Sequence, residues 1–267
     1  AWSRARRKNG VLPVSESLKR SSRARNALPV ILDLCETYRI PLTFGIVAHV
    51  AVASCDEHEK PPPFTPYWMD AGWYGVDPNS SMKTHPDYYG SALLSQISNS
   101  PVEHEIASHG FSHVDLSDDA TTLAVAEFEV KESLRILKKF DPHITTFIFP
   151  KNRPAHHNVL QSAGFTIYRE NKNGGLKKND HNLWQFPIGL WLTPNGFSPK
   201  EIAELIDLSI ERKVLFNAWC HLYEFENQKS TRRFFEPFFK KLAFCRDQGM
   251  LTVQTMRDIV GVNAMNS

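Results

Sequence analysis

The sequence predicts an α/β protein with a mainly parallel sheet. Short apolar runs alternate six or seven times with amphipathic stretches, the pattern of strands joined by crossover helices. None of the apolar runs reaches the roughly 18 residues that a membrane-spanning helix needs. Glycine-rich phosphate-binding motifs are absent, which weakens a nucleotide-binding function. An open doubly wound sheet and a closed barrel both fit this alternation.

The individual elements follow from periodicity and from helix-ending residues. Residues 26–39 have apolar positions at helical spacing, and Pro41 separates them from the apolar run 42–48, which we expect to be a buried strand. Further strands are predicted at 102–107, 145–150, 165–169, 183–190, 214–221 and 251–256. Further helices are predicted at 88–98, from Asp118 or Asp119 through 137, at 154–162, at 199–212 after a Ser198 cap, and at 231–248.

The chain of 267 residues is long enough for one large domain, and we expect a single domain over 1–267. Its net charge is only +2, but residues 1–25 hold eight basic residues against Glu16 alone. We interpret this segment as a solvated basic loop, because no DNA- or RNA-binding motif accompanies it. Residues 54–87 are rich in proline and aromatic residues, which predicts an irregular insertion that covers one end of the fold or takes part in function.

The cysteines and most histidines show no pairing pattern. The four cysteines form no C-x-x-C pair, which argues against a zinc ribbon (Cys35, Cys55, Cys220 and Cys245). An even number permits disulfides, but a chain of this size does not need them, so reduced thiols in a cytoplasmic setting are favoured. Three other histidines have no partner pattern either (His49, His58 and His85).

One motif points to metal chemistry. The strand at 102–107 leads into EIASHGFSHVDL, which holds His109 and His113. Two histidines at positions i and i+4 lie on one face of a helical turn, so we expect their imidazoles to converge on one divalent metal. Asp115 follows closely and is a candidate for orienting one of the two rings. The motif comes directly after a strand, where catalytic sites of barrels collect.

This string resembles the second motif of the NodB-type polysaccharide deacetylases, carbohydrate esterase family 4, whose pattern is H-[ST]-x-x-H. Other segments resemble further family motifs in the same order: LTFGIVA (42–48), FIFPKN (147–152), AGFTIYR (163–169) and LFNAWCHLYEF (215–225). The similarity covers about residues 27–256. It implies a distorted (β/α)7 barrel and metal-dependent N-deacetylation of an acetylated sugar in a polysaccharide or cell-envelope saccharide.

The resemblance also implies roles for single residues. His109 and His113 would be metal ligands, with zinc as the first candidate and cobalt or nickel also fitting two histidines and a carboxylate. His221 would be the general acid that protonates the departing amine. The third motif supplies candidate substrate contacts at Pro150, Lys151 and Asn152, where Phe149 stands in place of the family's arginine.

The family's acidic first motif has no counterpart in this sequence. That motif provides a catalytic base and a metal carboxylate, and no strand ending in paired acids precedes residue 39. Either another acid such as Asp70 substitutes, or the first strand with its motif lies upstream of Ala1. We expect the second, so that this chain lacks strand 1 and, with it, the catalytic base.

The aromatic residues suit a carbohydrate partner. Trp191 and Trp219 fall on predicted strands near the expected site, and indole faces stack on the apolar faces of sugar rings. Two functions remain open: a metal-dependent polysaccharide deacetylase, and a deacetylase-like module that binds carbohydrate without turnover. Neither a nucleic acid, a membrane span nor an obligate protein partner is indicated.

Overall fold

The computed structural model describes residues 5–6, 10–70, 72–169 and 174–265. Its main sheet has six strands in the order β3-β4-β5-β6-β8-β7, and the first five are parallel. Strand β7 closes one edge antiparallel to β8. The predicted α/β class with a mainly parallel sheet is therefore confirmed.

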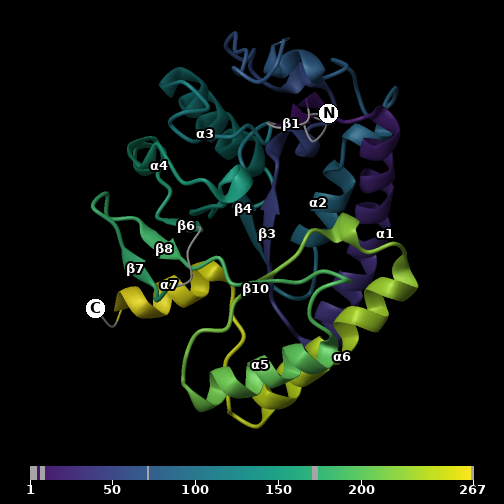
Figure 1. The fold of residues 1–267 in the computed structure, drawn as a ribbon, viewed down its shortest axis with the longest axis vertical. Coiled ribbons are helices and arrows are strands. Elements are labelled where there is room, and N and C mark those ends of the chain that lie inside the picture. Colours follow the sequence, from purple (N-terminus) through teal and green to yellow (C-terminus); the bar gives the residue numbers. More distant parts are fainter. Residues whose placement is uncertain (1–4, 7–9, 71, 170–173, 266–267) are drawn as a thin grey trace.

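Helices surround this sheet (Figure 1). The strands are β1 (Ala5–Arg6), β2 (Gly10–Val11), β3 (Thr43–Ile46), β4 (Glu105–Ser108), β5 (Thr146–Phe147), β6 (Ile167–Arg169), β7 (Lys177–Lys178), β8 (Trp184–Phe186), β9 (Leu190–Trp191) and β10 (Ala218–Trp219). The α-helices are α1 (Val14–Tyr38), α2 (Ser91–Ser98), α3 (Leu123–Leu137), α4 (His157–Ala163), α5 (Pro199–Glu211), α6 (Gln228–Asp247) and α7 (Met256–Met265).

Strands β9 and β10 pair parallel to each other in a separate two-stranded sheet. Together with the six-stranded sheet they carry the predicted strand order along the chain, from 42–48 to 214–221. Among the described residues no strand pairing joins the two sheets. Closure into a (β/α)7 barrel therefore stays a prediction.

The basic segment differs from the expectation. Helix α1 begins at Val14, so the interpretation of residues 1–25 as a loop was wrong for 14–25, while 1–4 and 7–9 lie outside the described residues. The solvent-facing charges of this part are compatible with a helix because one face still packs. Arg20 pairs with Glu16 one turn away at 2.9 Å, and Ser17 is buried. The apolar half of α1 packs against α6 (Figure 1).

The end of the chain also differs. Residues 251–255 form no strand, and helix α7 follows them directly. The start of α7 is held by Glu105, which is fully buried on β4 and accepts the Arg257 backbone N–H at 3.0 Å. Glu105 also accepts hydrogen bonds from the hydroxyls of Thr43 and Thr146. The buried carboxylate thus ties α7 to the amino-terminal ends of β3, β4 and β5.

Among its described residues, the proline-rich insertion 54–87 contains short 3-10 turns and a single β-bridge between Ser54 and Ser81, with no α-helix or longer strand, as its composition predicts. It is nevertheless packed into the main core through Trp73, which is 1% exposed. The insertion is thus part of the packed core, and its covering of one end of the fold stays a prediction. No described helix is both long and apolar enough to cross a membrane. All four cysteines are free thiols.

Candidate functional site

The candidate site begins at the carboxyl end of β4, where the chain turns into residues 109–113. This segment is a loop, so the expected helical turn was wrong. Gly110 and His113 both have positive φ, at 75° and 65°, which a helical turn does not allow. The two imidazoles still converge, with ring centroids 4.7 Å apart and planes at 75°.

Glu129 of α3 holds this loop in place. Its carboxylate accepts the backbone N–H groups of Phe111 and Ser112, each at 2.8 Å, and the Ser112 hydroxyl. The Tyr74 hydroxyl of the insertion donates to the same carboxylate at 2.9 Å. Trp73 adds an indole N–H bond to the Ser112 hydroxyl at 2.8 Å. The insertion and α3 therefore fix the loop that carries both histidines.

A backbone carbonyl orients His109. Its Nδ1 lies 2.6 Å from the oxygen of Ile148, and because a carbonyl only accepts, Nδ1 must carry the proton. The lone pair of Nε2 is then available to a metal. Burial, together with the nearby charges of Arg169, His221 and Lys151, lowers the pKa of His109 to about 3. The ring is therefore neutral at physiological pH, as a metal ligand must be.

His113 has the same electrostatic character. Burial lowers its pKa well below the usual range, and His109, Lys151 and His221 add to this shift. Its left-handed backbone conformation costs free energy, and the Glu129 bonds to the neighbouring residues hold it. Strain of this kind is typical of residues placed for function.

The third-motif residues line the neighbouring strand end. Pro150 is buried against the loop, and its Cγ lies 3.7 Å from the position that a Cβ on Gly110 would occupy. Lys151 is exposed and has a φ of 60°. Asn152 accepts a hydrogen bond from Arg169 at 2.5 Å. Pro150 and Lys151 thus lie beside the histidine loop, and the contact of all three residues with substrate stays a prediction.

His221 follows β10 and lies near the same site, since its charge perturbs both loop histidines. It stacks on Tyr223 with centroids 4.9 Å apart, and its Nδ1 lies 3.5 Å from Glu224 Oε1. Burial lowers the pKa of His221, while Glu224 opposes the shift. A carboxylate that supports the protonated imidazole suits a proton donor.

The two predicted tryptophans form a stacked pair. Trp191 and Trp219 have ring centroids 5.5 Å apart and planes at 8°, and Trp191 is 49% exposed. Arg169 lies over the Trp219 ring at 4.8 Å, and burial lowers its pKa to about 10. Its Nε and the Trp219 Nε1 are buried without a hydrogen-bond partner among the described residues. These donors leave capacity for a polar ligand.

An open pocket adjoins this aromatic pair. It is lined by residues of three segments, which are α1, the chain at and after β9, and the turn after β10 (Glu16, Arg20, Arg23, Trp191, Thr193, Pro194, Asn195, Tyr223 and Glu224). Arg20 lies over the Tyr223 ring at 5.0 Å. Helix α1 therefore brings positive charge to the edge of the site, in a region that the sequence led us to interpret as a solvated loop.

Asp115 is buried but engaged elsewhere. Its carboxylate accepts from the backbone and hydroxyl of Ser117 at 3.1 and 2.7 Å and from Arg153 at 3.0 Å. The group found to orient His109 is instead the Ile148 carbonyl. Asp115 thus shapes the chain after the loop, and its predicted role in orienting a ring stays a prediction.

Sequence reasoning missed three functional candidates: Glu129, Arg169 and Glu224. Glu129 could have been found, because it occupies the apolar stripe of α3 beside Ala126 and Val130, where an acid is unusual. Arg169 ends a strand, which is also a signal in parallel folds. Asp70 is exposed, and no described carboxylate forms a group of three with His109 and His113 within 4.8 Å.

No family model and no curated protein matches the chain. Solved structures do. A "putative polysaccharide deacetylase" from Mycobacterium smegmatis is 16% identical with a TM-score of 0.56, over 91% of this chain and 79% of that one. A CE4 family pseudoenzyme from Bacillus anthracis is 10% identical with a TM-score of 0.49, over 88% and 60%. The first likeness shows that this chain has the polysaccharide deacetylase fold.

Proposed function

We propose that this protein is a polysaccharide deacetylase of the carbohydrate esterase family 4 type, which removes the acetyl group from an N-acetylated sugar with the help of a divalent metal. The observation that carries the proposal is the convergence of His109 and His113 at the carboxyl end of β4. The fold shared with the Mycobacterium smegmatis structure supports it. Neither observation depends on the other.

The two histidines fit a metal. His109 presents an unprotonated Nε2 because its Nδ1–H is bound to Ile148, and burial keeps both rings neutral. His109 and His113 would hold zinc, or cobalt or nickel, each of which accepts imidazole ligands. A divalent metal there would supply Lewis-acid polarisation of the acetamide carbonyl and a more acidic bound water.

Other residues of the site suit two further needs of amide hydrolysis, a proton donor and positive charge near the carbonyl oxygen. His221, whose Nδ1 lies 3.5 Å from Glu224 Oε1, would give a proton to the departing amine. The positive charges of Arg169 and Lys151 act on His109, and they would stabilise the negative charge that develops on the carbonyl oxygen. The Trp191 and Trp219 rings offer an apolar surface for a sugar ring.

A second function is favoured by one observation. Among the described residues no carboxylate completes a three-ligand group with His109 and His113. A site with two imidazoles, two cations and stacked indoles can bind a saccharide without hydrolysing its amide. The alternative is therefore a non-catalytic carbohydrate-binding module on the same fold.

One experiment separates the two functions. The purified chain, loaded with zinc, is incubated with a tetramer of N-acetylglucosamine, and released acetate and bound ligand are both measured. A deacetylase releases acetate, and His109→Ala and His221→Ala each lower that release by at least about 100-fold. A binding module binds the tetramer without releasing acetate, and Trp219→Ala weakens that binding. Absence of both binding and release contradicts both functions.

A further inference from the structure

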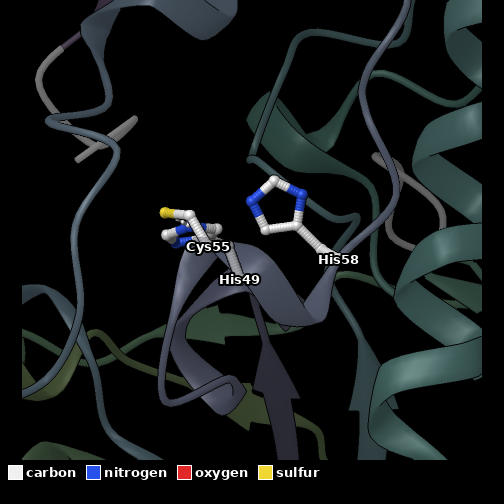
Figure 2. A group of neighbouring side chains, drawn as sticks. All are labelled: His49, Cys55 and His58. Carbon is white, nitrogen blue, oxygen red and sulfur yellow. Dashed lines mark hydrogen bonds between the residues drawn. The ribbon is translucent and has the colours of Figure 1, made fainter.

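Three side chains that follow β3 form a second cluster of metal-ligating groups. His49, Cys55 and His58 each offer a ligand atom, and these atoms lie within 4.8 Å of one another. Figure 2 shows the three side chains rising from one side of the segment that follows β3. None of them belongs to the site at His109 and His113. Within the described chain this is the one such cluster.

A fourth ligand lies against the same group. The Asp77 carboxylate places Oδ2 at 3.0 Å from His49 Nε2 and Oδ1 at 3.7 Å from Cys55 Sγ. The Asp77 side chain is only 8% exposed, and the His49 imidazole is the partner of its Oδ2. A buried carboxylate that lies against both an imidazole and a thiol is a fourth candidate ligand.

The two separations from the Cys55 sulfur suit a tetrahedral zinc ion, while the 3.0 Å between His49 Nε2 and Asp77 Oδ2 would have to lengthen by a few tenths of an ångström. With Zn–S near 2.3 Å and Zn–N or Zn–O near 2.0–2.2 Å, ligand atoms should lie about 3.3–3.6 Å apart. Cys55 Sγ lies 3.5 Å from His49 Nε2, within this range, and 3.7 Å from Asp77, close to it. His58 needs to approach by about 1 Å, and its half-buried ring on a loop allows that.

The chemistry of the donor set selects the metal. One thiolate, two imidazoles and one carboxylate match zinc, because thiolate disfavours magnesium and calcium while the full set suits a closed tetrahedral site. Cys55 and His58 are three residues apart, a spacing common among paired zinc ligands. A zinc ion would also balance the two negative charges of thiolate and carboxylate, which burial otherwise disfavours.

We propose that His49, Cys55, His58 and Asp77 bind a structural zinc ion, separate from the metal of the candidate active site. The position of the cluster gives the ion a role. His49 donates its backbone N–H to the Phe111 oxygen at 3.0 Å, and Ala48 donates to Gly110 at 2.9 Å. The ion would therefore link the start of the 54–87 insertion to the segment at residues 48–49, which is hydrogen-bonded to the loop that carries His109 and His113.

Cobalt substitution tests this site independently of activity. The full chain is stripped of metal with a chelator and titrated with Co²⁺ alone. A cobalt–thiolate bond gives charge-transfer absorption in the near ultraviolet, whereas cobalt bound by imidazole and carboxylate does not. We expect the band in the wild-type chain, in His109→Ala and in the control Cys245→Ala, and we expect its loss in Cys55→Ala. Absence of the band in the wild type, or its full retention in Cys55→Ala, overturns the proposal.

A second variant covers the case in which Cys55→Ala does not fold. His58→Gln changes a half-buried loop residue and leaves the thiol in place. Competition with a chromophoric chelator should show zinc affinity reduced by at least about ten-fold relative to wild type. Unchanged affinity in His58→Gln overturns the four-residue site. Loss of the band in His109→Ala would place the cobalt elsewhere and also overturn it.

Discussion

Removing the carboxylate of Glu129 should destabilise the protein by several kcal/mol although this residue touches neither histidine ring. In Glu129→Ala the buried backbone N–H groups of Phe111 and Ser112 lose their acceptor. Each unpaired buried donor costs about 1–3 kcal/mol, and the vacated space adds to this. We expect a loss of about 3–6 kcal/mol, a large fraction of the roughly 5–15 kcal/mol that holds a domain together.

Glu129→Gln should cost much less. One amide oxygen can still accept both backbone N–H groups, while the Ser112 and Tyr74 hydroxyls can rotate to accept from the amide nitrogen. Burial raises the pKa of Glu129, so the neutral amide also escapes part of the desolvation penalty. Weaker neutral hydrogen bonds remain the main loss, about 1–2 kcal/mol.

Urea unfolding followed by tryptophan fluorescence at pH 7 measures these values. Glu127→Ala is the matched control, because Glu127 lies on the same helix, is 46% exposed and pairs only loosely with Lys131 at 3.5 Å. It should change stability by less than about 0.5 kcal/mol. An Ala variant of Glu129 as stable as this control, or a Gln variant less stable than the Ala variant, would refute the reasoning.

Three further predictions concern stability. Burial lowers the pKa of His104 to about 4, so between pH 6.5 and 4 the unfolded state binds more protons than the folded state. The free energy of unfolding of the wild type should therefore fall as the pH is lowered from 6.5 to 4. In urea titrations at each pH, that of His104→Asn should fall less. Gly189→Ala should cost over about 2 kcal/mol, because φ is 73° and the added Cβ would lie 2.2 Å from the Asn217 oxygen. Gly261→Ala, in an open helical position, should be neutral or stabilising by up to about 1 kcal/mol, and the reverse order in thermal melts would contradict both values. Ser198→Ala should cost about 1 kcal/mol by urea unfolding, since it removes a capping box at the start of α5, and an unchanged midpoint would show that the cap contributes nothing.

The succession of strands along the chain and the position of the two-histidine motif after a strand could be predicted because both depend on local signals. Alternating apolar runs marked the strands, and His109, Asn152 and His221 each follow a strand, where parallel folds collect their chemistry. The Ser198 cap was predicted and is present. The prediction of a strand at 251–256 was wrong because an extended segment with apolar residues resembles a strand in sequence whether or not a neighbouring strand pairs with it.

The sequence placed the start of helix α1 at residue 26, twelve residues after its actual start at Val14, for a similar reason. Its first turns carry many charges and little apolar periodicity, and what stabilises them is packing against distant segments. Arg25, for example, donates to the Pro86 oxygen at 2.7 Å, sixty-one residues away. A contact of that sequence separation leaves no trace in a window of helical length.

The amino-acid sequence by itself determined the α/β class, the two-histidine motif and its position after a strand, because periodicity and motif spacing are properties of neighbouring residues. Only the tertiary structure decided what holds that motif. Glu129 reaches it from α3, Trp73 from the insertion and the Ile148 carbonyl from the segment after β5. It also brought His49, Cys55, His58 and Asp77 together. Such groupings depend on how separate elements pack, and packing is set by the whole chain and not by any local pattern.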